Sequence, residues 1–493
     1  MSTTPVTARM LETLLGEWRS PGPAYESLAD RIRLLVLDGR LTVDTRLPAE
    51  RDLAARLCLS RTTVAAAYRR LREGGYAISV RGSGTLTRLP SSAQVTHLAF
   101  GDGLLDLTKA ALPAPTVLAA EAREAAGDLA AYLGDAGYDP IGLAVLRQAI
   151  AQRYAERGLP TDPDEILVTV GAQQAIVLVA RALLTRGDRV LIEAPTYPHA
   201  YEALQAAGAR LVSVPVTADY GNQGQGQGQG QGVADDGWDV AALESAIRRT
   251  SPALAYLMPD FQNPTGRSMS APLRERLIDL AAGQGTIVVA DETPAELDID
   301  RPGTLLPLPA YAGGQEASVI LLGSASKAMW GGLRIGWIRA TRTMIRRLAA
   351  VRAGIDLGTP IFEQVLTARM LPHLDEILRD RRSMLERGRD AVETQLAARF
   401  PEWQVPHVDG GLAAWVNIGA PVSSQLALAA RNHGLLITAG PRFGIDGAFE
   451  RYLRVPITFT PAQVERAVDA LALAWPTLAR HPMPDPEYLA AVV

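Results

Sequence analysis

Cysteine is nearly absent from this 493-residue sequence, which contains only Cys58. A single cysteine cannot form an intramolecular disulfide, so the chain is not a disulfide-rich secreted scaffold. No apolar run reaches the roughly 20 residues that a transmembrane helix needs. The N-terminal residues are interrupted by charges such as Arg9 and Glu12 and do not read as a secretory signal. We therefore expect a cytoplasmic protein with no membrane association, in which Cys58 is a small buried side chain.

Lysine is also scarce, because only Lys109 and Lys327 occur among the 49 basic residues and all the others are arginine. Hydrophobic residues make up 47% and charged residues 21% of the sequence, which excludes a mainly disordered chain. A length of 493 residues exceeds what one ordinary hydrophobic core contains. The composition therefore predicts a globular protein with more than one domain.

Positive charge is concentrated in the first 90 residues. That segment holds 14 arginines and 9 acidic residues, a net charge of +5, whereas the whole chain has −4 and the remainder therefore −9. Contacts to nucleic-acid phosphates require local rather than global positive charge. A small nucleic-acid-binding module joined to a larger acidic domain has this pattern. Chance clustering of surface arginines is the alternative.

Helix and turn patterns in the basic segment predict a small domain. Apolar residues recur at helical spacing over residues 25–37, 49–57 and 61–73, and each stretch is followed by a turn. Residues 76–80 and 85–87 are two short strand patterns around a glycine-rich tip. Three helices and a hairpin predict a winged helix-turn-helix, whose third helix enters the major groove of DNA.

The start of the third helix carries residues suited to DNA. Ser60 is the expected N-cap, and the hydroxyls and arginine that follow it can meet phosphates and base edges. The motifs LPAERDLA at 47–54, LSRTTV at 59–64 and YRRLREGGY at 68–76 resemble the DNA-binding domain of GntR-type regulators. The resemblance implies DNA contacts by Arg51, Ser60, Arg61, Thr62 and Thr63, and by Arg81 and Gly82 at the wing. For Arg51, a local ion pair or a solvated helix face is the alternative.

Beyond residue 90 the character of the sequence changes. We place a DNA-binding domain at residues 22–90, an irregular linker at 91–104 and a larger domain at 105–480. In the larger domain, aliphatic strand patterns alternate with amphipathic helices, which predicts a mostly parallel α/β sheet. The strand patterns cover residues 165–170, 189–192, 253–258, 286–290 and 318–322. A glycine and glutamine tract at 221–232 is expected to be a flexible surface insertion.

Reactive residues follow the ends of these predicted strands, where parallel sheets collect functional groups. SASK at 324–327 with Arg334 seven residues later, NPTG at 263–266, and Asp291 after an apolar strand resemble fold-type I pyridoxal-phosphate enzymes of the aminotransferase class. This resemblance implies that Lys327 forms an aldimine, a Schiff base, with pyridoxal 5'-phosphate. It implies that Asp291 pairs with the pyridine nitrogen, Asn263 bonds the phenolic oxygen and Tyr197 stacks on the ring. The phosphate would be held by Ala172, Gln173, Ser324, Ser326 and Arg334.

Two further residues acquire roles from the same resemblance. Arg454 matches the arginine that grips a substrate carboxylate, so it is the predicted effector-binding residue. Tyr138 matches a tyrosine that reaches the phosphate bound by the partner subunit, which implies a homodimer. The sequence also departs from the family pattern. Thr293 and Pro294 stand where most relatives have a tyrosine, and His199 stands where the relative that senses γ-aminobutyrate has an arginine.

The two resemblances together point to the MocR/GabR group of transcriptional regulators. We expect the chain to bind pyridoxal 5'-phosphate, double-stranded operator DNA and a small amino compound as effector, and we predict no metal site. In this hypothesis a dimer uses the cofactor, as the signal itself or as the partner of an amino compound at Lys327, to shift its two DNA-binding heads. A catalytically active aminotransferase that carries a DNA-binding head is the alternative. A DNA-binding protein whose body binds no cofactor is a third reading.

Overall fold

The computed structural model describes residues 5–16, 18–19, 23–37, 40–41, 45–80, 84–88, 104–134, 136–217, 236–301, 303–445 and 447–478. The tract at 221–232, most of the predicted linker, and the predicted wing residues Arg81 and Gly82 lie outside these ranges. Within them, no helix has the length and apolar character needed to cross a membrane.

The N-terminal part of the chain, called the head below, is a helical domain with a small hairpin. Its elements are α1 Ala8–Leu15, α2 Ala24–Leu37, α3 Glu50–Arg56, α4 Arg61–Glu73, β1 Ala77–Val80 and β2 Gly84–Thr87. The two strands pair antiparallel, so the predicted helices and hairpin are present. Helix α1 has no counterpart in the sequence analysis. Its Leu11 and Leu15 are buried in the same core as Leu28 and Val64, so this core also includes residues that precede position 22.

Cys58 corrects one expectation, because its side chain is exposed rather than buried. Helix α3 ends at Arg56, and Cys58 has a φ of 55°, in the left-handed region. The turn leaves the flanking Leu57 buried in the head core and directs the cysteine outward. Cysteine usually behaves as a small buried hydrophobe, but the left-handed turn at Cys58 overrides that tendency here.

The remainder of the chain, called the body, is built on a seven-stranded sheet. Its strands run in the order β4-β10-β9-β8-β7-β5-β6. Five neighbouring strands are parallel, and only β10 runs antiparallel to both of its neighbours, as predicted for a mostly parallel sheet. The strand bounds are β4 Ile166–Thr169, β5 Arg189–Ala194, β6 Arg210–Pro215, β7 Leu254–Leu257, β8 Ile287–Asp291, β9 Val319–Ser324 and β10 Gly336–Arg339.

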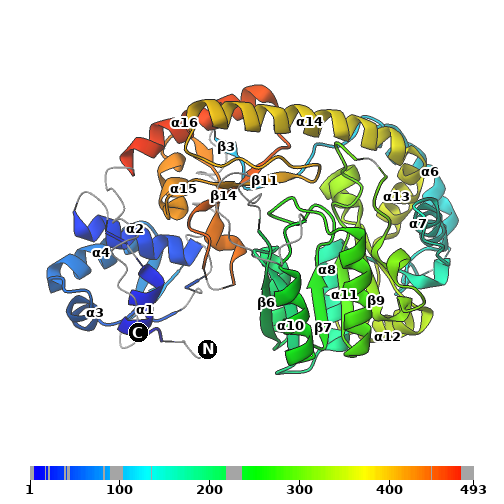
Figure 1. Ribbon diagram of the computed structural model, residues 1–493, viewed down its shortest axis with the longest axis horizontal. Helices are drawn as coiled ribbons and strands as arrows, with labels where there is room; N and C mark the ends of the chain where they lie inside the picture. Colours follow the sequence, from blue (N-terminus) through cyan, green and yellow to red (C-terminus); the bar gives the residue numbers. More distant parts are fainter. Residues whose placement is uncertain are drawn as a thin grey trace, which may run out of the picture.

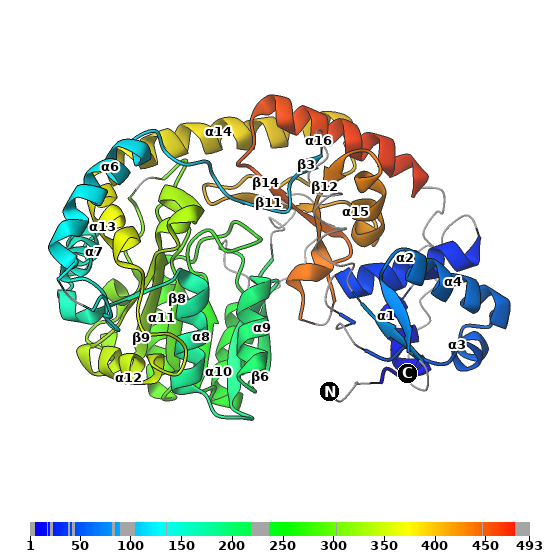
Figure 2. The same ribbon diagram turned by 180° about the vertical axis from the view of Figure 1, so that it is seen from behind.

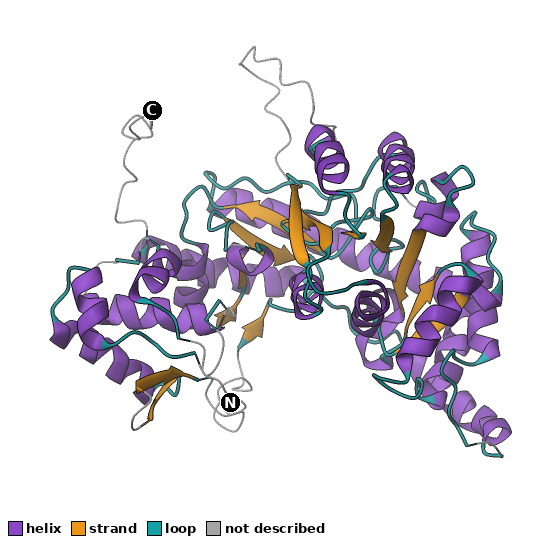
Figure 3. Cartoon of the chain, turned by 90° about the horizontal axis from the view of Figure 1, so that it is seen from below, coloured by secondary structure: helices purple, strands orange, loops and turns teal. Residues whose placement is uncertain are grey.

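Helices cover both faces of this sheet because alternate strand residues point to opposite sides. Leu191 and Val288 belong to one hydrophobic core, and their sequence neighbours Val190 and Val289 belong to the other. Figure 3 shows the helices packed around the strands of the body, with the head hairpin at the opposite end of the molecule. One core contains α7 Ala144–Glu156, α10 Val240–Thr250, α11 Ala271–Gly283 and α13 Ile361–Met370; the other contains α8 Ala172–Leu183, α9 Pro198–Ala206 and α12 Arg342–Arg352.

A smaller C-terminal subdomain lies between the large sheet and the head (Figure 1). It has a three-stranded antiparallel sheet in the order β11-β14-β13 and a parallel pair of β12 with β3. Figure 2 shows α14 and α16 running along one edge of the molecule, with α15 facing α2 of the head. The bounds are β3 Leu105–Asp106, α14 Leu374–Arg399, β11 Ala413–Asn417, α15 Ser423–Arg431, β12 Leu435–Leu436, β13 Thr438–Ala439, β14 Tyr452–Pro456 and α16 Pro461–Ala474. Helix α6 Leu118–Asp128 packs on α13 beside the large sheet.

Candidate functional site

A cavity of about 390 Å³ opens at the carboxyl ends of the parallel strands, between the large sheet and the C-terminal subdomain. This is where an open α/β sheet collects its functional groups, because successive strands end side by side there. Eight of the ten residues predicted to contact the cofactor line this cavity, together with the predicted effector residue Arg454. The eight are Ala172, Gln173, Tyr197, Asn263, Asp291, Ser326, Lys327 and Arg334.

Lys327 lies just after β9, in a single π-helical turn, Ser326–Trp330. Its Nζ donates a hydrogen bond to the carbonyl of Ala110 at 3.1 Å. Burial lowers the pKa of Lys327, the nearby Arg454 lowers it further, and Asp291 opposes the shift. A lowered pKa leaves more of the amine neutral at physiological pH, which is the form that can attack an aldehyde.

Asp291 ends β8 and is almost completely buried. Its Oδ2 accepts a hydrogen bond of 2.6 Å from the hydroxyl of Tyr256, and its Oδ1 accepts one of 3.0 Å from the backbone N–H of Thr293. Burial raises the pKa of Asp291, although these hydrogen bonds oppose the rise. A buried carboxylate of this kind is suited to a protonated ring nitrogen, which would supply the missing opposite charge.

Tyr256 is a site residue that sequence reasoning missed. It lies in the middle of β7, the strand next to β8, and its side chain reaches across to Asp291. In the sequence, Tyr256 is an aromatic residue within an apolar strand pattern, and no motif surrounds it. Thr293 stands where most relatives have a tyrosine, and in this chain a tyrosine hydroxyl on the neighbouring strand, that of Tyr256, donates to the Asp291 carboxylate.

The first turn of α8 and Arg334 form a set of donors at one end of the cavity. Gly171 precedes α8 with φ 82°, and no side chain caps the helix, so its first N–H groups are available to an anion. The φ of Gly171 lies in the left-handed region that favours glycine, and Nη2 of Arg334 would lie 2.9 Å from a Cβ at this position. Arg334 Nη2 also donates to the carbonyl of Val170 at 3.2 Å. Backbone N–H groups, a guanidinium and the Ser326 hydroxyl are a donor set that fits a phosphate.

Ser324 and Tyr138 are the two predicted cofactor residues that do not line the cavity. The Ser324 hydroxyl lies 2.9 Å from the Ser326 hydroxyl and 3.1 Å from the carbonyl of Ile335, and its single proton is donated to one of these two at a time. It also accepts a hydrogen bond of 3.1 Å from the Ser326 N–H. Ser324 therefore orients Ser326. Tyr138 is 71% exposed and lies on the surface before α7.

Asn263 and Tyr197 both line the cavity and belong to different segments of the chain. Asn263 follows β7, and Tyr197 follows β5 at the start of α9. Burial raises the pKa of Tyr197 to about 12, so its hydroxyl stays protonated. The centre of its ring lies 5.3 Å from that of His199, edge to face. The aromatic wall can pack against a flat ligand, and Asn263 adds a polar group beside it.

Arg454 enters the cavity from β14 and is 8% exposed. One Nη donates to the carbonyl of Thr108, and the guanidinium lies 5.3 Å from the centre of the Phe443 ring. Its buried Nε has no hydrogen-bond partner. Burial lowers the pKa of Arg454 to about 10. A ligand carboxylate would satisfy both the unpaired N–H and the buried charge.

The predicted DNA-contact residues that the structure describes lie around the start of α4. Ser60 caps α4, and its Oγ accepts a hydrogen bond of 3.1 Å from the N–H of Thr63. Arg51, Arg61 and Thr62 are exposed beside this cap. The two arginines pair only loosely with acids: Arg51 with Asp52 at 3.2 Å and Arg61 with Glu50 at 3.8 Å. Exposed pairs of this kind are weak and can be exchanged for DNA phosphates.

Two acidic residues and a histidine form a cluster that is not part of the Lys327 cavity lining. Ligand atoms of Asp300, His407 and Asp409 fall within 4.8 Å of one another. However, Asp300 pairs with Arg389 at 2.6 Å and Asp409 pairs with Arg301 at 2.7 Å. These arginines already neutralise the carboxylates, so we describe the group as a salt-bridge cluster.

Comparison with known families divides the chain in the same way as the structure. Residues 24–86 match the model of bacterial regulatory proteins of the gntR family, and residues 94–471 match aminotransferase class I and II. The fold and the cavity thus define an aminotransferase-like, pyridoxal-phosphate-binding body joined to a GntR-type winged helix-turn-helix.

Similar proteins include both transcriptional regulators and aminotransferases. The HTH-type transcriptional regulator YdcR of Escherichia coli is 27% identical over 87% of this chain and 94% of its own length. The probable rhizopine catabolism regulatory protein MocR of Rhizobium meliloti is 30% identical over 64% of this chain and 65% of its own. The structure of LysN, an α-aminoadipate aminotransferase from Thermus thermophilus, superimposes with a TM-score of 0.66 at 29% identity, covering 79% of this chain and 95% of LysN. The chain belongs to the aminotransferase class I and II family, in the MocR/GabR group, and is a pyridoxal-phosphate-dependent transcriptional regulator.

Proposed function

We propose that this regulator acts in the cytoplasm as a homodimer that binds double-stranded operator DNA and responds to a small amino compound bound beside Lys327. In this account the α4 surface of the head, with Arg51, Arg61 and the hydroxyls around Ser60, contacts the DNA. The amino compound occupies the cavity of the body and changes the position of the heads.

The observation that carries this proposal is the convergence of distant segments on one cavity. Lys327 follows β9, Asp291 ends β8 and Arg454 lies in β14, and all three line the same 390 Å³ space. The cavity therefore has room for an aldehyde-bearing aromatic ring with an amino compound beside it. LysN, the structural neighbour, was solved with N-(5'-phosphopyridoxyl)-L-leucine, a conjugate of this cofactor with an amino acid.

Each residue has a part in binding that follows from its chemistry. Pyridoxal phosphate, when bound, supplies an aldehyde that condenses reversibly with amines. The Lys327 amine, whose pKa is lowered, would be the group that condenses with this aldehyde, and Asp291 would keep the ring nitrogen protonated. The first turn of α8 and Arg334 bind the phosphate, and Arg454 binds a carboxylate of the amino compound.

An active aminotransferase is the alternative, and the same residues are compatible with it. The two functions differ in what happens to the cofactor. A sensor changes the cofactor spectrum reversibly when an amino compound is added or removed by dialysis. An aminotransferase converts the cofactor to its amine form, which returns only when an oxo acid is added.

DNA-binding measurements test the proposal. Labelled duplexes selected by the protein from a random pool serve as operators in fluorescence anisotropy titrations with pyridoxal phosphate and a panel of amino acids. We expect at least one amino acid to change the dissociation constant about fivefold or more, as for a typical allosteric coupling. Dissociation constants that stay the same across the panel would reject the sensing function.

A further inference from the structure

A second cavity, which we call the antechamber, adjoins the cofactor cavity. It has a volume of about 370 Å³. Thr108, Tyr197, His199 and Arg454 line both spaces, so the antechamber adjoins the cofactor cavity at these four residues.

The antechamber is lined by three arginines and a histidine, and by no carboxylate among the described residues. Besides Arg454 and His199, its walls include Arg431 and Arg442. Arg442 forms an ion pair with Glu202, which lies outside the lining. Burial alone would raise the pKa of Glu202, but hydrogen bonds from Arg442 and His199 hold it below its usual value, so this pair stays ionised.

Arg431 differs from Arg442 because its guanidinium forms no hydrogen bond or ion pair with any described residue. It is half-buried in the last turn of α15, where the helix dipole favours a positive charge. Together with the unpaired Nε of Arg454, it gives the antechamber excess positive charge. A half-buried arginine without a counter-ion is suited to a bidentate contact with a carboxylate or a similar anion.

We propose that Arg431 forms a second anion-binding subsite, and that the effector is an amino compound with a distal anionic group, such as a dicarboxylic amino acid. This inference rests on the proposed function, because the amino end of the effector would lie beside Lys327. The first carboxylate is bound by Arg454, and the distal one enters the antechamber and pairs with Arg431.

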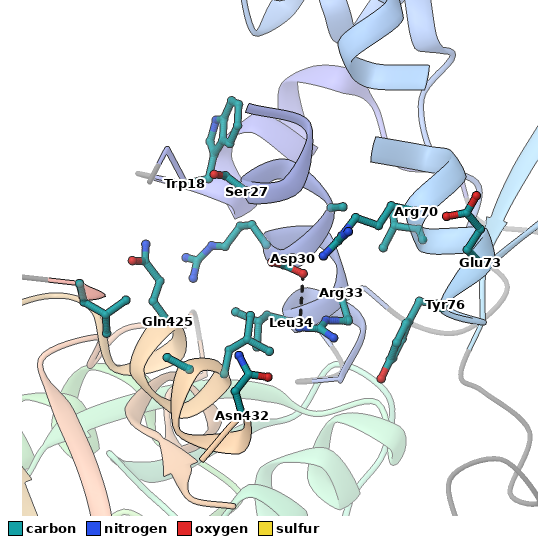
Figure 4. A pocket seen from close by; sticks show the side chains of 17 residues that line it. Trp18, Ser27, Asp30, Arg33, Leu34, Arg70, Glu73, Tyr76, Gln425 and Asn432 are labelled. Atoms are coloured by element: carbon teal, nitrogen blue, oxygen red, sulfur yellow. Dashed lines mark ion pairs between the residues drawn. The ribbon is translucent and has the colours of Figure 1, made fainter. Parts of the chain in front are cut away.

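The antechamber also has a wall that belongs to the DNA-binding head. Leu34 of α2 and Leu428 of α15 line the antechamber, and both also line a cavity of about 520 Å³ between the head and the body. Figure 4 shows Leu34 beside Asn432 and Gln425 of the α15 region, with Arg33 and Arg70 of the head around the same space. Leu34 is the described head residue on the antechamber lining, so an anion bound there would occupy a cavity that the head helps to enclose.

Matched pairs of amino acids test the subsite. Aspartate, glutamate and 2-aminoadipate are titrated against their side-chain amides, with the visible spectrum of the cofactor-loaded full-length protein as the readout. We expect the wild type to bind at least one acid about tenfold more tightly than its amide, the value for a charge-assisted hydrogen-bonded pair. Arg431→Gln should reduce this preference to about twofold or less, while Arg431→Lys keeps part of it.

Controls separate this inference from the proposed function. Arg346→Gln changes an exposed arginine of α12 that lines neither cavity, so it should leave the preference unchanged. Equal binding of acid and amide by the wild type, or a full preference retained in Arg431→Gln, would overturn the subsite but not the sensor. If no amino acid of either kind changes the spectrum, the proposed function itself fails.

Discussion

Arg31 in helix α2 of the head and Glu450 of the body form an ion pair of 3.0 Å across the interface between the two parts. Both side chains are shielded, with 10% and 18% of their surface exposed. The Glu450 carboxylate also accepts hydrogen bonds from the N–H and the hydroxyl of Ser424, at 3.0 and 2.9 Å. The same chain segment continues directly into β14, which carries Arg454. This ion pair therefore joins the DNA-binding head to the strand that lines the cofactor cavity.

Removal of the ion pair should uncouple the head from the cavity. We expect Arg31→Met to reduce the effect of an amino compound on the DNA dissociation constant by roughly fivefold, since a shielded pair is worth about 1 kcal/mol. The cofactor spectrum and its response to the same compound should not change. Anisotropy titrations and absorbance spectra on one preparation measure both quantities.

Arg33→Met is the matched control for that experiment. Arg33 lies in the same helix and pairs with Asp30, also in α2, at 3.3 Å, so its loss breaks no contact between head and body through this pair. An effector response that Arg31→Met leaves at full size would contradict the coupling.

We predict that Arg61 contributes to DNA binding through a contact with a phosphate. Its side chain is 77% exposed and its pair with Glu50 is long, at 3.8 Å, so it is free to contact a phosphate. For Arg61→Ala we expect weaker binding and a slope of log affinity against log salt that is smaller by about 1. Arg346→Ala on the body should leave the slope unchanged. An unaltered slope in Arg61→Ala would place this arginine outside the DNA interface.

The buried carboxyl group of Glu193 should make the free energy of unfolding depend on pH. It is fully buried in β5, where it accepts hydrogen bonds from Nε1 of Trp238 at 3.1 Å and Nε2 of Gln262 at 3.2 Å. Burial raises the pKa of Glu193 from 4.5 to about 8, against the effect of these hydrogen bonds. Between these values the folded state holds a proton that the unfolded chain has lost, so the free energy of unfolding contributed by this group falls as pH rises.

The variant Glu193→Gln should remove this pH dependence. We expect the melting temperature of the wild type, relative to Glu193→Gln, to fall progressively from pH 4.5 to about pH 8 and to level off above it. Differential scanning fluorimetry over this range measures the difference. Parallel curves for the two proteins would show that Glu193 does not change its protonation on unfolding.

Local sequence patterns were enough to predict much of the fold. The three helices and the hairpin of the head have clear apolar periodicity and turn residues, and five strand patterns of the body lie within the observed sheet. Other elements were missed, among them the short strands of the C-terminal subdomain, helix α1 and β10. Helix α1 is short and depends on contacts with the rest of the head core, and β10 is only four residues long.

The site was predictable where its residues form contiguous motifs. SASK with Arg334 and NPTG are continuous signals, and the cavity brings them together. Tyr256 and the Arg31 pair were not predictable, because each depends on a partner that is close only in the folded chain. Arg31 and Glu450 are separated by 419 positions. Contacts of this kind follow from how the strands and the two parts pack, which no local pattern encodes.

Borohydride trapping followed by peptide mapping tests the central claim most directly, because the chain has only two lysines. Lys109 is the matched control: it also lines the cavity, but it is 76% exposed and pairs with Asp106 at 3.3 Å. The protein is incubated with pyridoxal phosphate, reduced, digested and analysed by mass spectrometry. We predict the cofactor on the peptide of Lys327, with the adduct kept in Lys109→Arg and lost in Lys327→Arg. An adduct on Lys109 alone, or none at all, would contradict the account.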